Sequence, residues 1–500
     1  MTNTTEWITR SVSRLRSGAP STDKAPKASK PAADKPLADK QVADGAATKV
    51  PAPRSTHERL QATLRRGNES LSPRALRRLL ADLQDVVAPQ VSELEGGRRA
   101  QVVAGWYGQA EPEERRDMWL LLCEQFAPDA TRFQSARQRY EAAAGTADEG
   151  QAEISLRRAL VSPRTRLMQR FAVFPEGMRF LVDLRAELLP QLKSDKRLVA
   201  LDADLEHLFT TWFDVAFLEL RRLSWDSPAS LIEKLIKYEA VHDIRSWADL
   251  KNRLDSDRRC YGFFHPRLPN EPLIFVEVAL VDRISSSITP LLDEAAAPAD
   301  LKKATTAIFY SISNTQPGLR GVSFGDSLIK NVVDTLCAEF PRLRTFATLS
   351  PIPGLRTWLG KNAGAMLDKL TDKQRAELGR AIGAEPLQAP QLLAAFDKSQ
   401  ALDAKSPVRQ MLMRCAASYL ARELSNGKPA DPVARFHLGN GARVEQLNWG
   451  GDPSAKGHKQ SYGLMVNYLY DLKRIDKHRS LLAEGKVAAS KAIEGLCLPR

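Results

Sequence analysis

The sequence contains few cysteines, and none of them is arranged as a pair. Among 500 residues there are five, an odd number, with no CxxC spacing. They stand at Cys123, Cys260, Cys337, Cys415 and Cys497. This usage excludes a disulfide framework and a zinc–thiolate site, and it indicates a reducing compartment.

Long apolar runs are absent as well. No stretch of about 18 apolar residues occurs, so a transmembrane helix is not expected. The N-terminus lacks the apolar core of a secretory signal. Arg10, Arg14 and Arg16 give it a faint likeness to a mitochondrial presequence, but acidic residues between Glu6 and Asp44 argue against one. We therefore expect a cytoplasmic protein with no membrane partner.

Several motifs that carry well-known chemistries are missing. The sequence has no GxxxxGK[ST] loop, no HExxH pair and no zinc-finger spacing, and Ser350 does not stand in a GxSxG elbow. His437, His458 and His478 are too far apart in sequence to form a compact ligand motif. The net charge of +13 is compatible with nucleic acid, but no RNP-type motif or dense basic run accompanies it. We expect no metal site and no nucleic-acid partner.

Residues 1–55 have the composition of a disordered tail. Residues 1–56 hold ten Lys or Arg against five Asp or Glu, and almost no large apolar side chain follows Ile8. Such a segment buries too little apolar area to offset its conformational entropy. We therefore predict a disordered tail over residues 1–55.

Residues 56–210 have the periodicity of an all-helical domain. Apolar residues recur at three- and four-residue intervals, as in Leu76, Leu79, Leu80, Leu83 and Val86. Alternating strand patterns are almost absent, and no repeat of about 20–50 residues indicates a solenoid. The pattern predicts several amphipathic helices whose apolar faces form a core.

The pattern changes after about Ser224, where strands and helices alternate. Residues 273–280, 307–312 and 345–349 are typical of strands, and residues 326–340 of a helix. Residues 436–438 and 442–447 flank Gly439-Asn440-Gly441, which is a hairpin signal. This order indicates an α/β domain, which we assign to residues 211–500.

The loop before the predicted helix at residues 326–340 is rich in glycine. Gly318, Gly321 and Gly325 would let the backbone approach a ligand closely, and the start of a helix can bind phosphate. Arg320 adds a positive charge. A plain glycine-rich turn with Asp326 as the helix cap explains the pattern equally well.

Two further segments carry polar residues with catalytic potential. Ser350 follows the third predicted strand, and the two prolines after it hold it rigidly. His437 is predicted on a strand beside the hairpin. Taken alone, each is more often a structural residue than a catalytic one. Tyr462, Tyr468 and Tyr470 are expected to be core aromatics, with at most one hydroxyl reaching a site.

Together these segments resemble the malonyl-CoA decarboxylase family. The most specific strings are Leu349-Ser350-Pro351-Ile352-Pro353-Gly354 and Phe436-His437-Leu438 with Asn440-Gly441-Ala442. Gly318-Leu319-Arg320-Gly321-Val322 with Gly325, and Gly463-Leu464-Met465 with Asn467-Tyr468, add to the likeness. The resemblance covers the chain beyond the tail and is strongest from about Tyr261 onward.

The resemblance implies a fold and a set of site residues. The fold class is α and α/β, an N-terminal all-helical domain followed by a GNAT-like α/β catalytic domain. Ser350 and His437 match the family's catalytic residues, and Tyr470 matches a tyrosine important for activity. The acyl-CoA loop corresponds to Arg320, Gly321, Val322, Ser323, Phe324, Gly325 and Asp326, with Ser323 at a position where relatives can have an acid.

The resemblance also implies conversion of malonyl-CoA to acetyl-CoA and CO₂ through a thioester enolate, without cofactor or metal. We favour His437 as the proton donor and Ser350 as the hydrogen-bonding partner. We expect a homo-oligomer, a dimer or tetramer, formed through the helical domain. Two alternatives from other classes stay open. One is a GNAT-type CoA-dependent acyltransferase, and the other is a non-catalytic helical scaffold.

Overall fold

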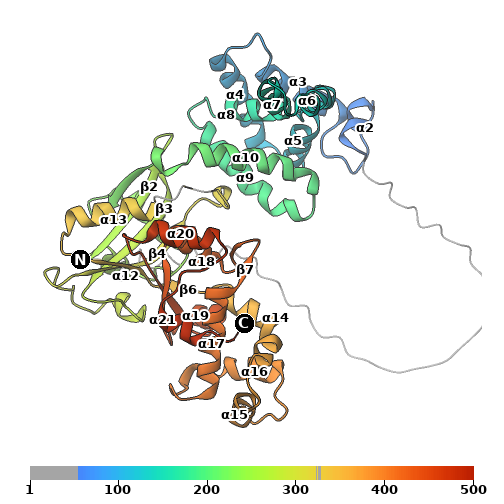
Figure 1. Ribbon diagram of the computed structural model, residues 1–500. Helices are drawn as coiled ribbons and strands as arrows, with labels where there is room; N and C mark the ends of the chain where they lie inside the picture. Colours follow the sequence, from blue (N-terminus) through green and yellow to red (C-terminus); the bar gives the residue numbers. More distant parts are fainter. Residues whose placement is uncertain (1–53, 323, 325–327, 500) are drawn as a thin grey trace, which may run out of the picture. The chain divides into compact units, whose positions relative to one another are not determined.

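The computed structural model describes residues 54–322, 324 and 328–499 (Figure 1). The predicted tail lies outside this range except for Arg54 and Ser55. Three residues of the predicted acyl-CoA loop, Ser323, Gly325 and Asp326, also lie outside it.

The first part of the described chain is helical, as the periodicity predicts. Its helices are α2 (Thr56–Gln61), α3 (Pro73–Val86), α4 (Glu93–Gln109), α5 (Pro112–Gln125), α6 (Ala130–Ala143), α7 (Glu149–Leu160), α8 (Pro163–Phe171), α9 (Gly177–Leu188) and α10 (Val199–Trp212). Short 3₁₀ turns, Leu189–Lys193 and Lys196–Leu198, join α9 to α10. Helix α3 buries Leu76, Leu79, Leu83 and Val86, the stripe that the sequence predicts. Its apolar face therefore forms core.

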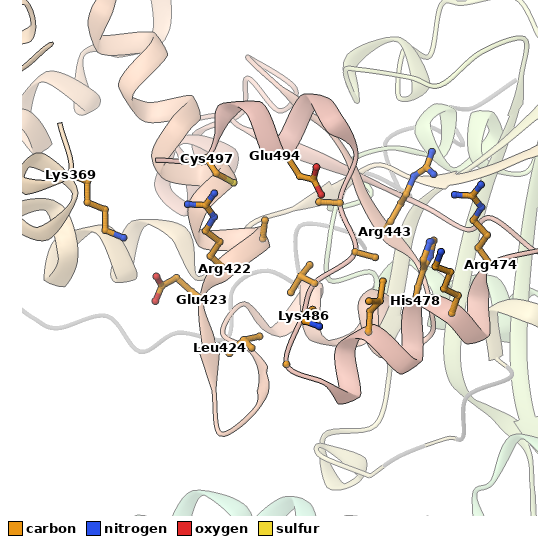
Figure 2. Close-up of a pocket in the computed structure, with 17 residues that line it drawn as sticks. Lys369, Arg422, Glu423, Leu424, Arg443, Arg474, His478, Lys486, Glu494 and Cys497 are labelled. Carbon is orange, nitrogen blue, oxygen red and sulfur yellow. The ribbon is translucent and has the colours of Figure 1, made fainter. Parts of the chain in front are cut away.

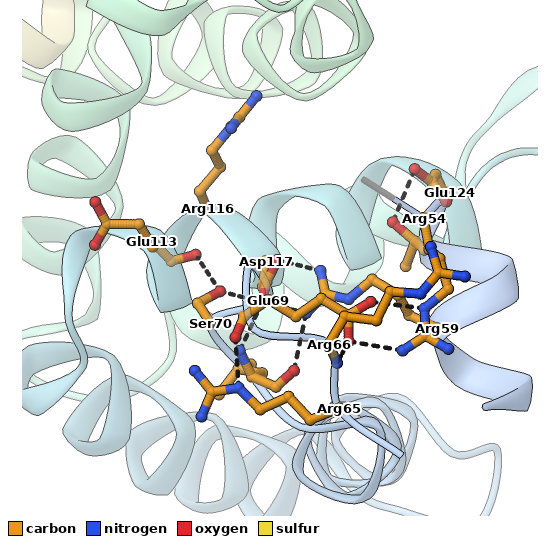
Figure 3. Close-up of polar contacts among 12 residues, drawn as sticks. Arg54, Arg59, Arg65, Arg66, Glu69, Ser70, Glu113, Arg116, Asp117 and Glu124 are labelled. Atoms are coloured by element: carbon orange, nitrogen blue, oxygen red, sulfur yellow. Dashed lines mark hydrogen bonds and ion pairs between the residues drawn. The ribbon is translucent and has the colours of Figure 1, made fainter. Parts of the chain in front are cut away.

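Buried ion pairs fix the beginning of the helical part (Figure 3). Arg59 of α2 makes two hydrogen bonds to the Asp117 carboxylate on α5, at 2.6 and 2.7 Å. Arg54 pairs with the buried Glu69 at 2.7 Å, and Ser55 caps α2. Arg54 and Ser55 are thus attached to the folded chain, although the sequence prediction places them in the tail.

The second part is built on one mixed sheet. Its strands are β1 (Glu219–Leu223), β2 (Arg258–His265), β3 (Leu268–Val281), β4 (Thr306–Asn314), β5 (Thr345–Thr348), β6 (Ser350–Pro351), β9 (Arg443–Asn448) and β10 (Met465–Leu469). The order is β1-β2-β3-β4-β5-β10-β6, with β9 also paired to β10. Among the strands formed by the described residues, only β4 and β5 pair in parallel, with Ile308 opposite Ala347, and helix α13 (Leu328–Glu339) connects them. The three predicted strands and the helix between the second and third are confirmed.

Further helices surround the sheet or lie beyond it in the chain. They are α11 (Ala229–Tyr238), α12 (Trp247–Arg253), α14 (Leu355–Asp368), α15 (Asp372–Ile382), α16 (Ala389–Asp397), α17 (Pro407–Arg422), α18 (Pro432–Gly439), α19 (Ala455–Ser461), α20 (Ile475–Ala483) and α21 (Lys491–Leu496). A separate ribbon pairs β7 (Leu424–Ser425) with β8 (Lys428–Pro429). The predicted fold class, helical and then α/β, is confirmed. Within the described residues, none of the helices is both long and apolar enough to span a membrane.

The predicted hairpin at residues 436–447 is wrong. His437 lies in the last turn of helix α18, and only the second predicted strand forms, as β9. Asp431 caps the helix, with Pro432 as its first residue, an arrangement that starts helices efficiently. Gly441 has a φ of +81°, so the glycines end a helix rather than form a hairpin turn.

Candidate active site

Ser350 lies two residues after the end of strand β5. It forms the two-residue strand β6 with Pro351 and pairs with Val466 of β10. Its hydroxyl is buried and donates a hydrogen bond to Thr348 Oγ1 at 2.8 Å. The same oxygen lies 3.3 Å from His437 Nε2. The fold therefore brings together two residues that are 87 positions apart in the chain.

His437 connects Ser350 to Tyr470. Its Nδ1 lies 2.8 Å from the Tyr470 hydroxyl, which comes from the residue just after β10. The imidazole also stacks on the ring of Tyr468 at 4.8 Å between centroids. Helix α18, strand β6 and the end of β10 thus contribute one side chain each to a continuous polar chain. Of the three tyrosines expected in the core, Tyr470 supplies the hydroxyl that reaches the site.

Burial determines the charge states of the His437 and Tyr470 side chains. His437 is 3% exposed, and removal from water lowers the pKa of its imidazole to about 3. Burial also raises the pKa of Tyr470 far above its usual value. Both groups are therefore neutral near pH 7. Since Ser350 donates to Thr348, the consistent arrangement has His437 Nε2–H donating to Ser350 and the Tyr470 hydroxyl donating to Nδ1.

A second group of residues holds the Ser350 turn against helix α18. One oxygen of the buried Asp431 carboxylate caps the helix through the N–H groups of Val433 and Ala434. The other accepts the Gly354 N–H at 3.0 Å. A Cβ on Gly354 would lie 2.1 Å from the Tyr419 hydroxyl, so only glycine fits there. Asp431 was not predicted as a site residue from the sequence, although the pair Asp431-Pro432 is a helix-start signal.

A cavity of about 220 Å³ opens beside Tyr470. Helix α13 supplies Ile329, Lys330 and Val333 to its lining, and helix α20 supplies Ile475 and Asp476. Its wall includes Tyr470, the last member of the hydrogen-bonded Ser350–His437–Tyr470 path. Lys330 places a cation at its edge.

The glycine-rich loop precedes α13. Gly321 has a φ of +85°, and a Cβ there would meet no atom of a described residue within 4 Å. No described residue therefore fills the space in front of it. Arg320 is exposed, whereas the side chains of Val322 and Phe324 are buried in the core. No hydrogen bond between described residues joins this loop to Ser350, His437 or Tyr470.

A cavity of about 990 Å³ lies elsewhere (Figure 2). It is lined by the other side of α20, and its wall contains none of Ser350, His437 and Tyr470. Three of the six Lys and Arg residues in its lining, Arg443, Arg474 and Lys486, are each paired with a nearby carboxylate. His478 also lines it and is held through Nδ1 by the Gly441 carbonyl at 3.0 Å. Among the described residues, no group of three or more His, Cys, Asp or Glu side chains is placed to hold a metal ion.

These observations define a class: a helical region joined to a mixed α/β region that carries a buried Ser–His–Tyr chain. The family model described as the malonyl-CoA decarboxylase C-terminal domain matches residues 216–499. The model of the N-terminal domain of the same family matches residues 126–213. The chain belongs to the malonyl-CoA decarboxylase family.

Individual relatives agree with this assignment. A goose (Anser anser anser) protein named malonyl-CoA decarboxylase, mitochondrial, is 39% identical over 63% of this chain and 65% of its own length. A mouse protein of the same name is 36% identical over 80% of this chain and 85% of its own length. The crystal structure of malonyl-CoA decarboxylase from Rhodopseudomonas palustris has a TM-score of 0.72 and 41% identity, covering 84% of this chain and 99% of that one. The Cupriavidus metallidurans structure has a TM-score of 0.70 and 43% identity, covering 85% and 100%.

Proposed function

We propose that this protein converts malonyl-CoA to acetyl-CoA and CO₂ at the hydrogen-bonded side chains of Ser350, His437 and Tyr470. The observation that carries the proposal is the continuous hydrogen-bonded path through these three side chains, beside a cavity, in a member of this family. The path offers a hydroxyl that can stabilise an oxyanion and an imidazole that can deliver a proton, which are the two functions that this reaction needs.

The reaction breaks the bond between the α-carbon and the carboxylate of the malonyl group. The electron pair moves into the thioester carbonyl and forms an enolate, and the α-carbon must then take up one proton. Preorganised donors at the developing oxyanion contribute the largest share of such catalysis, about 3–4 kcal/mol for one donor. In the proposed arrangement the Ser350 hydroxyl turns from Thr348 toward the substrate and supplies this donor.

His437 supplies the proton in this proposal. The buried imidazole is neutral in the free enzyme, because its pKa is lowered to about 3. The incoming malonyl carboxylate adds a negative charge beside it and raises that pKa, so the ring takes up one proton from solvent when substrate binds, the proton that the overall reaction consumes. When CO₂ leaves, the negative charge passes to the enolate. The imidazolium then donates its Nε2 proton to the α-carbon, while the Tyr470 oxygen accepts a hydrogen bond from Nδ1.

The glycine-rich loop is the proposed site of the CoA phosphates. Gly321 faces open space, Arg320 is exposed, and Lys330 lies at the edge of the Tyr470 cavity. Exposed cations and an accessible backbone are the features that a phosphate site needs, and they support this proposal. The roles of Ser323, Gly325 and Asp326 remain predictions from the sequence.

The proposal is tested by incubating the purified chain with malonyl-CoA and a metal chelator, and measuring acetyl-CoA and CO₂. Equal amounts of the two products are expected, with no loss of rate from the chelator. Transfer of an acyl group to an added amine without release of CO₂ would instead favour the acyltransferase alternative. No turnover, together with no affinity for CoA, would favour the scaffold alternative.

We also propose a cytoplasmic location and a homo-oligomer assembled through the helical part. All five cysteines are free, which is consistent with a reducing compartment. Helix α4 exposes the apolar side chains of Leu94 and Val102, which a partner subunit would cover. Imaging of a fluorescent fusion tests the location. Light scattering of the purified chain tests the oligomer.

A further inference from the structure

Arg185 extends from the helical part of the chain to the glycine-rich loop. It lies on α9 and is only 1% exposed. Its Nη1 donates to the carbonyl oxygens of Gly318 and Arg320, at 2.8 and 3.0 Å. Its Nε donates to Asp202 on α10 at 2.7 Å, so a second partner also fixes the orientation of the guanidinium.

Helix α9 and the glycine-rich loop pack closely against each other. A Cβ on Gly318 would lie 1.9 Å from the backbone oxygen of Val182, so helix and loop meet backbone to backbone. Six residues earlier on α9, Arg179 donates to the Gln316 side chain at 2.6 Å. Helix α9 therefore holds the loop at Gln316, Gly318 and Arg320.

The hydrogen bonds from Arg185 determine the direction of the Gly321 N–H. In a trans peptide the carbonyl and the following N–H point in opposite directions. Since the Arg320 carbonyl points at Arg185, the Gly321 N–H points away from α9, and no backbone carbonyl of a described residue accepts it. Gly321 is also the residue that faces open space with a φ of +85°.

We infer that Arg185 is a positioning residue for CoA binding, a role that rests on the function proposed above. It does not touch the ligand. It holds the peptide between Arg320 and Gly321 in the orientation that presents an N–H to a phosphate of CoA. The helical part of the chain thus contributes to substrate recognition.

Removing the guanidinium should loosen the peptide between Arg320 and Gly321. It should leave the arrangement of the Ser350, His437 and Tyr470 side chains unchanged. The loss should therefore appear in binding rather than in the chemical step. We expect Arg185→Met to weaken CoA affinity about tenfold or more, to raise KM for malonyl-CoA by a similar factor, and to leave kcat within about threefold.

Arg164 offers a matched control. It is also a buried arginine in the helical part, and it pairs with Asp204 of α10 at 2.8 Å. Its Nη1 likewise donates to two carbonyl oxygens, but these belong to Leu122 and Cys123 of α5. Arg164→Met therefore removes the same kind of network away from the loop.

The experiment measures the Kd of CoA by calorimetry, with Tm and steady-state kinetics, for the full chain and its Arg185→Met, Arg185→Lys and Arg164→Met variants. Arg185→Met is expected to lose CoA affinity. Arg164→Met is expected to lower Tm but to keep the wild-type Kd. Arg185→Lys keeps the positive charge but lacks the planar guanidinium. Its CoA affinity is expected to lie between those of wild type and Arg185→Met.

Equal CoA affinity in wild type and Arg185→Met, or an equal loss in both methionine variants, would overturn the inference. If Arg185→Met fails to fold, Arg185→Lys decides, and a wild-type Kd in that variant would overturn it. Wild type that binds CoA but does not decarboxylate malonyl-CoA would refute the proposed function alone. Wild type that does not bind CoA would refute both.

Discussion

The carboxylate of Asp431 joins the two segments that carry the Ser–His pair, because it caps helix α18 and also accepts the Gly354 N–H at 3.0 Å. The helix carries His437, and Gly354 ends the turn that begins at Ser350. The distance between the Ser350 oxygen and the His437 nitrogen thus depends on a side chain that need not touch the substrate.

Asp431→Asn tests this dependence. The amide oxygen can still cap the helix, but the amide nitrogen then faces the Gly354 N–H, so that hydrogen bond is lost. We expect kcat to fall about tenfold or more, because misplaced catalytic groups lose rate steeply. The exposed Asp129 caps α6 through the Arg132 N–H, which makes Asp129→Asn the control. Equal kcat in both variants would contradict this account.

Gly321→Val tests the proposed phosphate loop. A β-branched residue at a φ of +85° is strained, at a cost of roughly 1–2 kcal/mol, and its side chain fills the space open to the ligand. Gly383 has a φ of +74° and equally open space, so Gly383→Val carries the same strain outside the loop. Calorimetry should show weakened CoA binding only for Gly321→Val. Unchanged CoA affinity in that variant would remove the loop from the site.

The buried neutral imidazole predicts an acid-sensitive fold. The folded-state pKa of His437, about 3, lies below the ordinary value of 6.5, so between these pH values only the unfolded chain takes up this proton. The stabilisation is fully present above pH 6.5 and is lost as the pH falls toward 3. At pH 5 the loss amounts to about 2 kcal/mol. Urea unfolding of His437→Asn should therefore depend less steeply on pH than that of wild type. Parallel pH curves would contradict this assignment.

The beginning of the folded chain can be tested with two deletions. Removing residues 1–53 keeps the Arg54–Glu69 ion pair and the Ser55 cap of α2. Removing residues 1–55 loses both, and the lost cap alone should cost about 1 kcal/mol. We expect wild-type Tm and turnover after the shorter deletion and a lower Tm after the longer one. A lower Tm after the shorter deletion would show that residues 1–53 stabilise the fold.

Local patterns were enough to predict most of the secondary structure. The leucine spacing in α3 and the apolar runs of β3 and β4 each reflect burial along a single element. The error at His437 arose from two competing local signals. Gly439-Asn440-Gly441 suggested a hairpin, but Asp431-Pro432 had already started a helix that the glycines merely end.

The candidate site was only partly visible in the sequence. Ser350 and His437 were identified by motif resemblance, but their contact joins residues 87 positions apart, which no local pattern encodes. Asp431 and Arg185 were missed because their partners, Gly354 and Gly318, are backbone groups distant in sequence. Such contacts become visible only when the chain has folded.

The turnover of malonyl-CoA by Ser350→Ala and His437→Asn tests the central claim most directly. His265→Asn, which alters another buried histidine on β2, is the matched control. Each site variant should lose about 10²-fold or more in kcat, with CoA affinity unchanged, while the control keeps wild-type turnover. The double variant should lose less than the product of the single losses, because both groups act on one transition state. Near-normal turnover in either single variant would contradict the proposed role of that residue.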